Sequence, residues 1–104
     1  AMKYLLSFIL VLLSSAGHTS QALDIAIETG GIRVEYIPSS QRGIVRVYRC
    51  AQCSQSYYKF STPPIIIKRG EKISFNEFLK DYWNAKFPTL ILDKESLNIS
   101  KVVY

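Results

Sequence analysis

The chain has 104 residues, 48% of them hydrophobic, and its 13 lysines and arginines outnumber its 8 aspartates and glutamates to give a formal net charge of +5. This length has room for one domain with a small core, which excludes a multidomain architecture. The mildly basic charge favours anionic partners such as acidic proteins, polysaccharides or lipid head groups, although no block of five like charges occurs and ordinary solvated surface charge is the simpler interpretation.

The first 22 residues have the pattern of a secretory signal peptide. Lys3 supplies a short positive region, residues 4–13 form a largely apolar run, and Ser20 and Ala22 are the small residues expected just before a cleavage site. The run is about half as long as the roughly 20 apolar residues of a transmembrane helix, so cleavage is favoured over anchoring.

Cleavage after Ala22 would leave one small domain, residues 23–104, without a stable membrane span. We expect Met2 to be the natural start and Ala1 to be a cloning remnant. An exported protein, whether periplasmic or secreted, meets an oxidising environment in which disulfides persist, and nucleic acid fits this compartment poorly. The expected partner is therefore another protein or an anionic surface.

Five β-strands are predicted in the first part of the mature chain, from short apolar stretches that are separated by glycine-, proline- and serine-rich turns. They are expected at residues 23–27, 32–37, 44–49, 57–60 and 65–67. Pro63 and Pro64 lack amide donors and therefore mark an edge or a crossover before the fifth strand. The continuous run of residues 65–67 is typical of a strand buried on both faces.

One helix is predicted after these strands. Ser74 and Glu77 form a capping box at its start, and Pro88 ends it. Apolar residues at helical spacing would form one core-facing stripe with Trp83 at its centre, supported by Phe75, Phe78, Leu79 and Tyr82.

Two final strands are expected at residues 90–92 and 99–103. The order of five strands, one helix and two strands predicts an α+β fold. We expect a small, mostly antiparallel β-sheet with one amphipathic helix packed across a face.

Cys50 and Cys53 are the only cysteines. Their spacing allows a disulfide, because a β-turn brings the Cα atoms of residues i and i+3 within about 7 Å. We favour a structural disulfide in the turn between the third and fourth strands, which would stabilise the fold by about 2 kcal/mol or less because the loop is small. A zinc site shared by two copies of the chain is an alternative, since zinc binds four ligands.

A redox role is the main alternative for the cysteine pair. The predicted strand at residues 44–49 runs into Cys50-Ala51-Gln52-Cys53, and the segment Phe-Pro-Thr-Leu-Ile-Leu follows at residues 87–92. Both segments resemble thioredoxin-like proteins, in which a long helix starts at the cysteines and a cis-proline begins a strand. The resemblance implies disulfide exchange through the two cysteines, and Arg49 would favour the reactive thiolate form. A helix starting at Cys53 would support this role, whereas a hairpin would support a structural disulfide.

No other catalytic constellation is present. The single histidine, His18, lies in the predicted signal peptide, so the mature chain has no serine–histidine or cysteine–histidine pair. The carboxylates are scattered, and no glycine-rich phosphate loop occurs. We therefore expect no cofactor and no metal, and we favour a non-enzymatic binding or interaction domain.

One candidate binding surface follows from strand alternation. If the valines of the third strand and the larger apolar residues of the fourth face the core, their neighbours point outward onto one open face. Arginine and tyrosine are enriched at interfaces, and cations interleaved with aromatic rings suit an anionic partner. The alternative is the ordinary wet face of an antiparallel sheet. The candidate binding residues are Arg33, Arg46, Tyr48, Tyr57 and Lys59.

Overall fold

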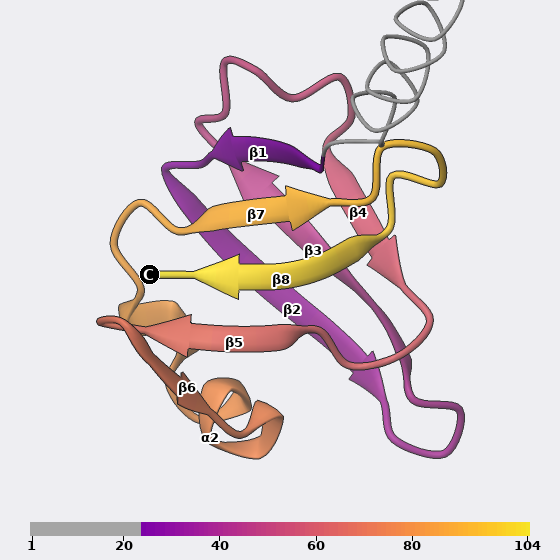
Figure 1. Ribbon diagram of the computed structural model, residues 1–104, viewed down its shortest axis with the longest axis vertical. Helices are drawn as coiled ribbons and strands as arrows, with labels where there is room; N and C mark the ends of the chain where they lie inside the picture. The colour runs from indigo at the N-terminus through magenta and orange to yellow at the C-terminus, as the bar shows by residue number, and fades with distance from the viewer. Residues whose placement is uncertain (1–23) are drawn as a thin grey trace, which may run out of the picture.

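The computed structural model describes residues 24–104, and the predicted signal peptide lies outside these residues (Figure 1). Two β-sheets and two short helical segments make up the described part. In chain order they are β1 (Ile25–Glu28), β2 (Gly31–Ile37), β3 (Arg42–Tyr48), β4 (Tyr57–Phe60), β5 (Ile65–Lys68), β6 (Glu71–Ile73), the α-helix α2 (Phe75–Leu79), the 3₁₀ segment η1 (Tyr82–Asn84), β7 (Thr89–Leu92) and β8 (Ile99–Val103). None of the helices between residues 24 and 104 is long and apolar enough to cross a membrane.

The two sheets are stacked as layers, with β2, β3 and β4 behind the other strands in Figure 1. The larger sheet has the order β1-β7-β8-β5-β6, in which only β5 and β8 run parallel. The smaller sheet has the order β2-β3-β4 and is antiparallel throughout. All seven predicted strands are present, and β6 is an additional strand. The fold is therefore mostly β and largely antiparallel, with one short helix.

The core lies between the two sheets, because alternate residues of each strand point toward the other layer. From the smaller sheet, Val45, Tyr58 and Phe60 are almost completely buried. They meet buried residues of the larger sheet and of α2, namely Ile66, Phe78, Leu90, Leu92, Ile99 and Val102. Each sheet thus covers one face of the other, which is the role that the sequence analysis had assigned to a helix.

The chain crosses between the sheets twice, from β1 to β2 and then from β4 to β5, and the second crossing lies at Pro63 and Pro64. This agrees with the crossover predicted from the two prolines. The prediction that β5 is buried on both faces is wrong, because only Ile66 is buried and Ile65 is 45% exposed. Between residues 24 and 104 no third layer covers the outer face of β5, so a strand with an apolar run is buried on one side only.

Gly43 allows two aromatic rings to approach the backbone of β3. It lies directly opposite Tyr36 on one side and Phe60 on the other, and these two rings stack at 6.1 Å between centroids. A Cβ atom at Gly43 would lie 2.5 Å from the Phe60 ring and 2.5 Å from the carbonyl oxygen of Glu35. The glycine is therefore required by close packing in the core.

The start of the helix is as predicted. The backbone N–H of Glu77 donates a hydrogen bond to the Ser74 hydroxyl at 3.1 Å, which is the first half of the capping box. The helix α2 then ends at Leu79, long before Pro88. It lies beside β5 and β6 at one edge of the layers (Figure 1), so packing of an amphipathic helix across a sheet face is not confirmed.

Asp81 is the residue at which the helical pattern is interrupted. Its backbone has φ −137° and ψ −6°, outside the helical region, while its carboxylate accepts hydrogen bonds from Lys68, Asn84 and Tyr104. These contacts fix Asp81 against the ends of β5 and β8, and the chain continues as η1 instead of a second helical turn.

The interruption at Asp81 corrects the prediction for Trp83. Trp83 is 63% exposed and is not the central core residue. Phe78 has that position: it is 0% exposed and packs against the rings of Phe75, Tyr82 and Tyr104 at centroid distances of 5.8, 6.0 and 5.9 Å. Trp83 contacts the Tyr82 ring edge-on, and most of its side chain is exposed.

Candidate binding surface

The outer face of the β2-β3-β4 sheet carries the five candidate residues. In antiparallel pairing, directly opposite residues point to the same face. Arg33 lies opposite Arg46, and Arg46 lies opposite Tyr57, so these three side chains form one row across the sheet. Tyr48 lies opposite Gly31 at one end of the face, and Lys59 lies opposite Ile44 in the adjoining row. The structure therefore places all five residues on one face, and their binding role stays a prediction.

Arg46 is held in place by two neighbours on this face. Its Nε donates to Glu35 Oε2 at 2.6 Å, and its guanidinium carbon lies 5.8 Å from the centroid of the Tyr57 ring. The hydrogen bond that Arg46 donates to Glu35, followed by the charge of the same carboxylate, raises the pKa of Arg46. The side chain is therefore a permanent cation with a fixed orientation, although both members of the ion pair are close to half exposed.

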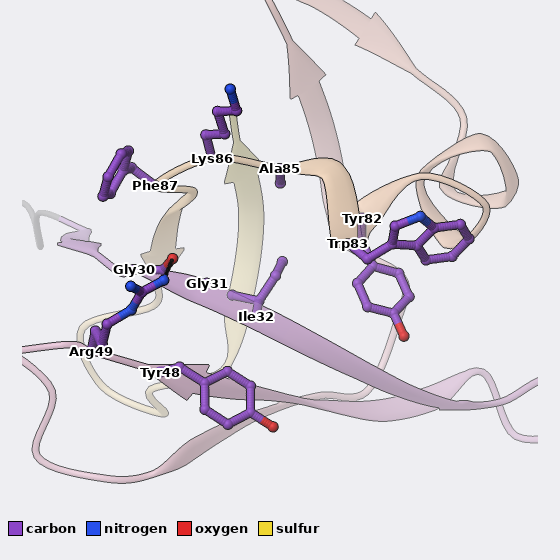
Figure 2. Close-up of a pocket in the computed structure, with 10 residues that line it drawn as sticks. All are labelled: Gly30, Gly31, Ile32, Tyr48, Arg49, Tyr82, Trp83, Ala85, Lys86 and Phe87. Atoms are coloured by element: carbon purple, nitrogen blue, oxygen red, sulfur yellow. Dashed lines mark hydrogen bonds between the residues drawn. The ribbon is translucent and has the colours of Figure 1, made fainter.

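A groove adjoins one end of this face (Figure 2). Its floor is formed by Gly30, Gly31 and Ile32 at the start of β2, and its volume is about 510 Å³. The aromatic side chains that line it come from three separate segments: Tyr48 from the end of β3, Tyr82 and Trp83 from η1, and Phe87 from the segment before β7. Arg49 and Lys86 are the two cations of the lining.

The groove contains two residues with left-handed backbone conformations. Phe87 has φ 49° and Arg49 has φ 52°, a region that residues other than glycine seldom occupy. Phe87 is also 73% exposed, and Tyr48 is 46% exposed. An aromatic ring that is held in solvent by a strained backbone contributes little to the core, and such strain occurs preferentially at functional sites.

Gly30 is required for the position of Arg49. The Arg49 Nη2 atom donates to the Gly30 carbonyl oxygen at 3.1 Å, and the Gly30 amide donates to the Tyr48 carbonyl at 2.8 Å. A Cβ at Gly30 would lie 2.6 Å from the Arg49 Cβ and would displace the side chain. Gly31 differs, because no atom lies within 4 Å of a Cβ built there.

A second hollow continues the groove toward the cysteine turn. It has a volume of about 430 Å³, and it shares Gly30, Arg49 and Phe87 with the first hollow. Gln52 and Glu28 add an amide and a carboxylate to its lining. The two hollows therefore lie side by side, and hydrogen-bond donors and acceptors line both of them.

Cys50 and Cys53 form a disulfide in the connection between β3 and β4. The Cα atoms are 5.5 Å apart, and both residues are partly buried against the core. The two strands flanking the turn pair with each other, and no helix begins at Cys53. This is the hairpin expected for a structural disulfide. The peptide bond before Pro88 is also trans, unlike the segment of thioredoxin-like proteins that residues 87–92 resemble.

Asp81 and Tyr104 form a separate polar contact near the groove. Hydrogen bonds from Asn84 and then Lys68 lower the pKa of Asp81. Burial, followed by the charge of Asp81, raises the pKa of Tyr104 to about 12. These contacts explain why the backbone leaves the helical conformation at Asp81. No cluster of three or more histidine, cysteine or acidic residues suited to a metal ion occurs within residues 24–104.

The sequence analysis predicted the outer sheet face but missed the groove. Tyr48 was identified because it belongs to a regular strand, whereas Trp83 was assigned to the core because its spacing from Phe75 and Leu79 is helical. A usable signal was present in Phe87, since an aromatic residue between Lys86 and Pro88 lies outside both periodic patterns. Comparison of the chain with protein-family models, curated proteins and solved structures found no match.

Proposed function

We propose that this chain is an exported, non-enzymatic binding module whose outer β2-β3-β4 face binds an acidic partner protein. The observation that carries the proposal is the row formed by Arg33, Arg46 and Tyr57. Two arginines stand directly opposite each other in adjacent strands, in register with an exposed tyrosine.

A like-charged pair in this position opposes folding. Directly opposite residues have Cβ atoms about 4.5–5.5 Å apart, and like charges at that distance destabilise a sheet. Glu35 compensates Arg46 only, and Arg33 has no ion pair within the part of the chain that the structure describes. A partner carboxylate placed between the two guanidinium groups would turn this repulsion into attraction, which is the arrangement expected of a binding face.

The partner class follows from the shape and chemistry of the face. A face formed by three strands offers a broad surface, and arginine and tyrosine are the side chains that most often dominate protein interfaces. Lys59 adds a further cation at the edge of the same face. Acidic side chains of a folded partner can reach several of these groups together, whereas the groove described above suits a narrower ligand.

Export is supported by two independent features. The N-terminal residues have the composition of a signal peptide, and Cys50 and Cys53 are paired as expected in an oxidising compartment. The disulfide lies in the turn that joins β3 to β4, so it supports the alignment of the strands that carry Arg46 and Tyr57.

The test is a charge reversal with a matched control. Arg46→Glu with Lys59→Glu changes the outer face of the smaller sheet. Lys72→Glu with Lys101→Glu makes the same change of net charge on β6 and β8 of the larger sheet. Both variants should melt as folded proteins. Proteins captured from the exporting compartment are then identified, purified and titrated against each variant, in low salt and at about 0.5 M salt, where exposed charge interactions are screened.

The proposal requires an acidic protein that binds the wild type and the Lys72/Lys101 control alike, loses binding to the Arg46/Lys59 variant, and weakens with salt. Equal binding to both variants would refute it. The proposal would also be contradicted if no acidic protein bound and the wild type were retained on anionic lipid vesicles. The partner would then be a membrane surface.

A further inference from the structure

We infer that the groove between β2, η1 and the Phe87 segment binds an anionic linear glycan, such as a chain of uronic acid residues. This site goes beyond the protein-binding face proposed above and does not depend on it. Its key residues are Tyr48, Arg49, Trp83, Lys86 and Phe87.

The aromatic lining provides the first argument. Tyr48, Trp83 and Phe87 are among the most exposed large apolar side chains in the described part of the chain. All three line the hollow together with Gly30 and Gly31, whose lack of side chains leaves it open, and Phe87 and Trp83 lie on opposite sides of it in Figure 2. A pyranose ring has a flat face of C–H groups, which packs on an aromatic ring and removes both apolar surfaces from water. Exposed rings around an open floor suit such a ligand.

The polar lining provides the second argument. Arg49 uses one N–H for the Gly30 carbonyl and retains further donors in its planar guanidinium group. Gln52 supplies both a donor and an acceptor, and Glu28 supplies acceptors. Sugar hydroxyls both donate and accept hydrogen bonds, so a mixed lining of this kind matches them.

Charge selects an anionic glycan. Arg49 and Lys86 line the first hollow, and neither forms an ion pair with another residue of the range 24–104. The guanidinium of Arg49 can bind a carboxylate with two parallel hydrogen bonds. The carboxylate of Glu28 lines only the adjoining hollow, so the carboxylate of the ligand is expected beside Arg49 and Lys86 and not beside Glu28.

The shape indicates a chain rather than a single sugar. The two hollows have volumes of about 510 and 430 Å³ and lie next to each other, because Gly30, Arg49 and Phe87 line both. Phe87 stands at their junction, where its strained backbone keeps the ring exposed. A linear ligand would pass Trp83 and Tyr48, cross the Arg49–Phe87 junction and end near Gln52.

Trp83 makes the test direct, because it is the only tryptophan in the chain. The probes are short oligogalacturonates, oligomannuronates and hyaluronan fragments, with neutral malto-oligosaccharide and a short polyglutamate peptide for comparison. Binding is measured by the Trp83 emission and by its protection from acrylamide quenching. We expect a saturable blue shift and protection with at least one of the uronates, and neither with the neutral sugar or the peptide.

Two variants test the position of the site. In Gly31→Leu, the new side chain enters space with no atom within 4 Å of its Cβ, so the fold should be retained while the groove is filled. Lys86→Glu reverses one cation of the lining. Both should weaken uronate binding by about tenfold or more, and Lys72→Glu, with the same charge change on β6, should leave it unchanged.

Three results would overturn the inference. The first is no saturable change of Trp83 emission with any of the three uronates. The second is equal binding by polyglutamate through the same residues, which would assign the groove to an acidic peptide. The third is loss of uronate binding in the Arg46→Glu, Lys59→Glu variant with retention in Gly31→Leu, which would place the glycan on the outer sheet face. If the Arg46→Glu, Lys59→Glu variant still binds the uronate, the glycan site is distinct from the protein-binding face, and each of the two proposals can fail without the other.

Discussion

Helical spacing predicts that Trp83 is the central core residue and that Phe78 supports it, whereas in the structure Phe78 is central and Trp83 is exposed, and this difference is measurable. Phe78 is 0% exposed and contacts three aromatic rings. Truncating a fully buried phenylalanine to alanine costs about 3–5 kcal/mol, and a domain of this size is stable by only about 4–12 kcal/mol. Phe78→Ala is therefore expected to unfold a large part of the population. Phe78→Leu keeps an apolar side chain and should cost about 1–2 kcal/mol.

Trp83→Ala is the matched comparison. Because Trp83 is 63% exposed and touches Tyr82 by an edge-on contact, its removal should cost about 1 kcal/mol or less. Urea unfolding followed by circular dichroism gives both values without using the tryptophan signal. For a urea slope of about 2 kcal/mol/M, Phe78→Leu should lower the midpoint by about 0.5–1 M, and Trp83→Ala by less.

The native emission of wild-type Trp83 should resemble that of a solvent-exposed indole. The reasoning fails if Trp83→Ala lowers the midpoint by as much as Phe78→Leu, or if the native emission is strongly blue-shifted in the absence of ligand. Either result would mean that the tryptophan belongs to the core, as uninterrupted helical spacing predicts, and that Asp81 does not divert the chain.

Further predictions concern packing, pH, the disulfide and export. Gly43→Ala should lower the free energy of unfolding by about 1–3 kcal/mol in urea titrations, because its Cβ would lie 2.5 Å from the Phe60 ring, whereas Gly31→Ala should not. Burial raises the pKa of Tyr104 from 10.0 to about 12, so the neutral form is favoured in the folded state. The contribution of this hydroxyl to stability is complete below pH 10 and is lost as the pH rises toward 12. Tyr104→Phe has no hydroxyl to ionise, so melting curves should show a smaller loss of stability over this pH range in the variant than in the wild type. Replacing Cys50 and Cys53 by serine should reduce stability by about 2 kcal/mol or less, and catalytic reduction of a disulfide substrate by the wild type alone would favour the redox role instead. Expression in an exporting host should give an N-terminus at Leu23 within two residues by intact mass, and retention of Met2 would contradict cleavage.

The strands could be predicted because one requirement dominates their sequences: every second side chain must be apolar to face the core. In β4, Tyr58 and Phe60 are buried while Tyr57 and Lys59 are not, so period-two alternation is visible in four consecutive residues. The third strand also alternates around Val45. Such local patterns identify which side chains share a face. They do not identify the number of sheets, and the division into two layers depends on the crossover at Pro63 and Pro64 and on pairing between distant segments.

β6 could not be predicted because nothing in its three residues requires a strand. Glu71 and Lys72 are exposed, and the strand exists through its pairing with β5. Ile65 shows the opposite error. A run of three isoleucines is equally compatible with burial on one face or on two, and only the position of β5 relative to the second layer decides between them.

The groove arises from the same interruption that invalidates the helix prediction. Phe75, Phe78, Leu79, Tyr82 and Trp83 have helical spacing, and local propensity alone would keep all five on one face. Asp81 changes the outcome because its carboxylate finds partners in Lys68 and Tyr104, which belong to β5 and to the residue after β8. Those contacts exist only once the larger sheet has formed, so no local pattern contains them.

The chain beyond Asp81 then adopts the 3₁₀ turn of η1, with hydrogen bonds from Asn84 to Asp81 and from Ala85 to Tyr82. In this conformation Trp83 forms a wall of the groove instead of a part of the core, and the following residues lead to Phe87 on its far side. The only tryptophan of the chain is therefore exposed, and this exposure is what the proposed glycan site requires of it.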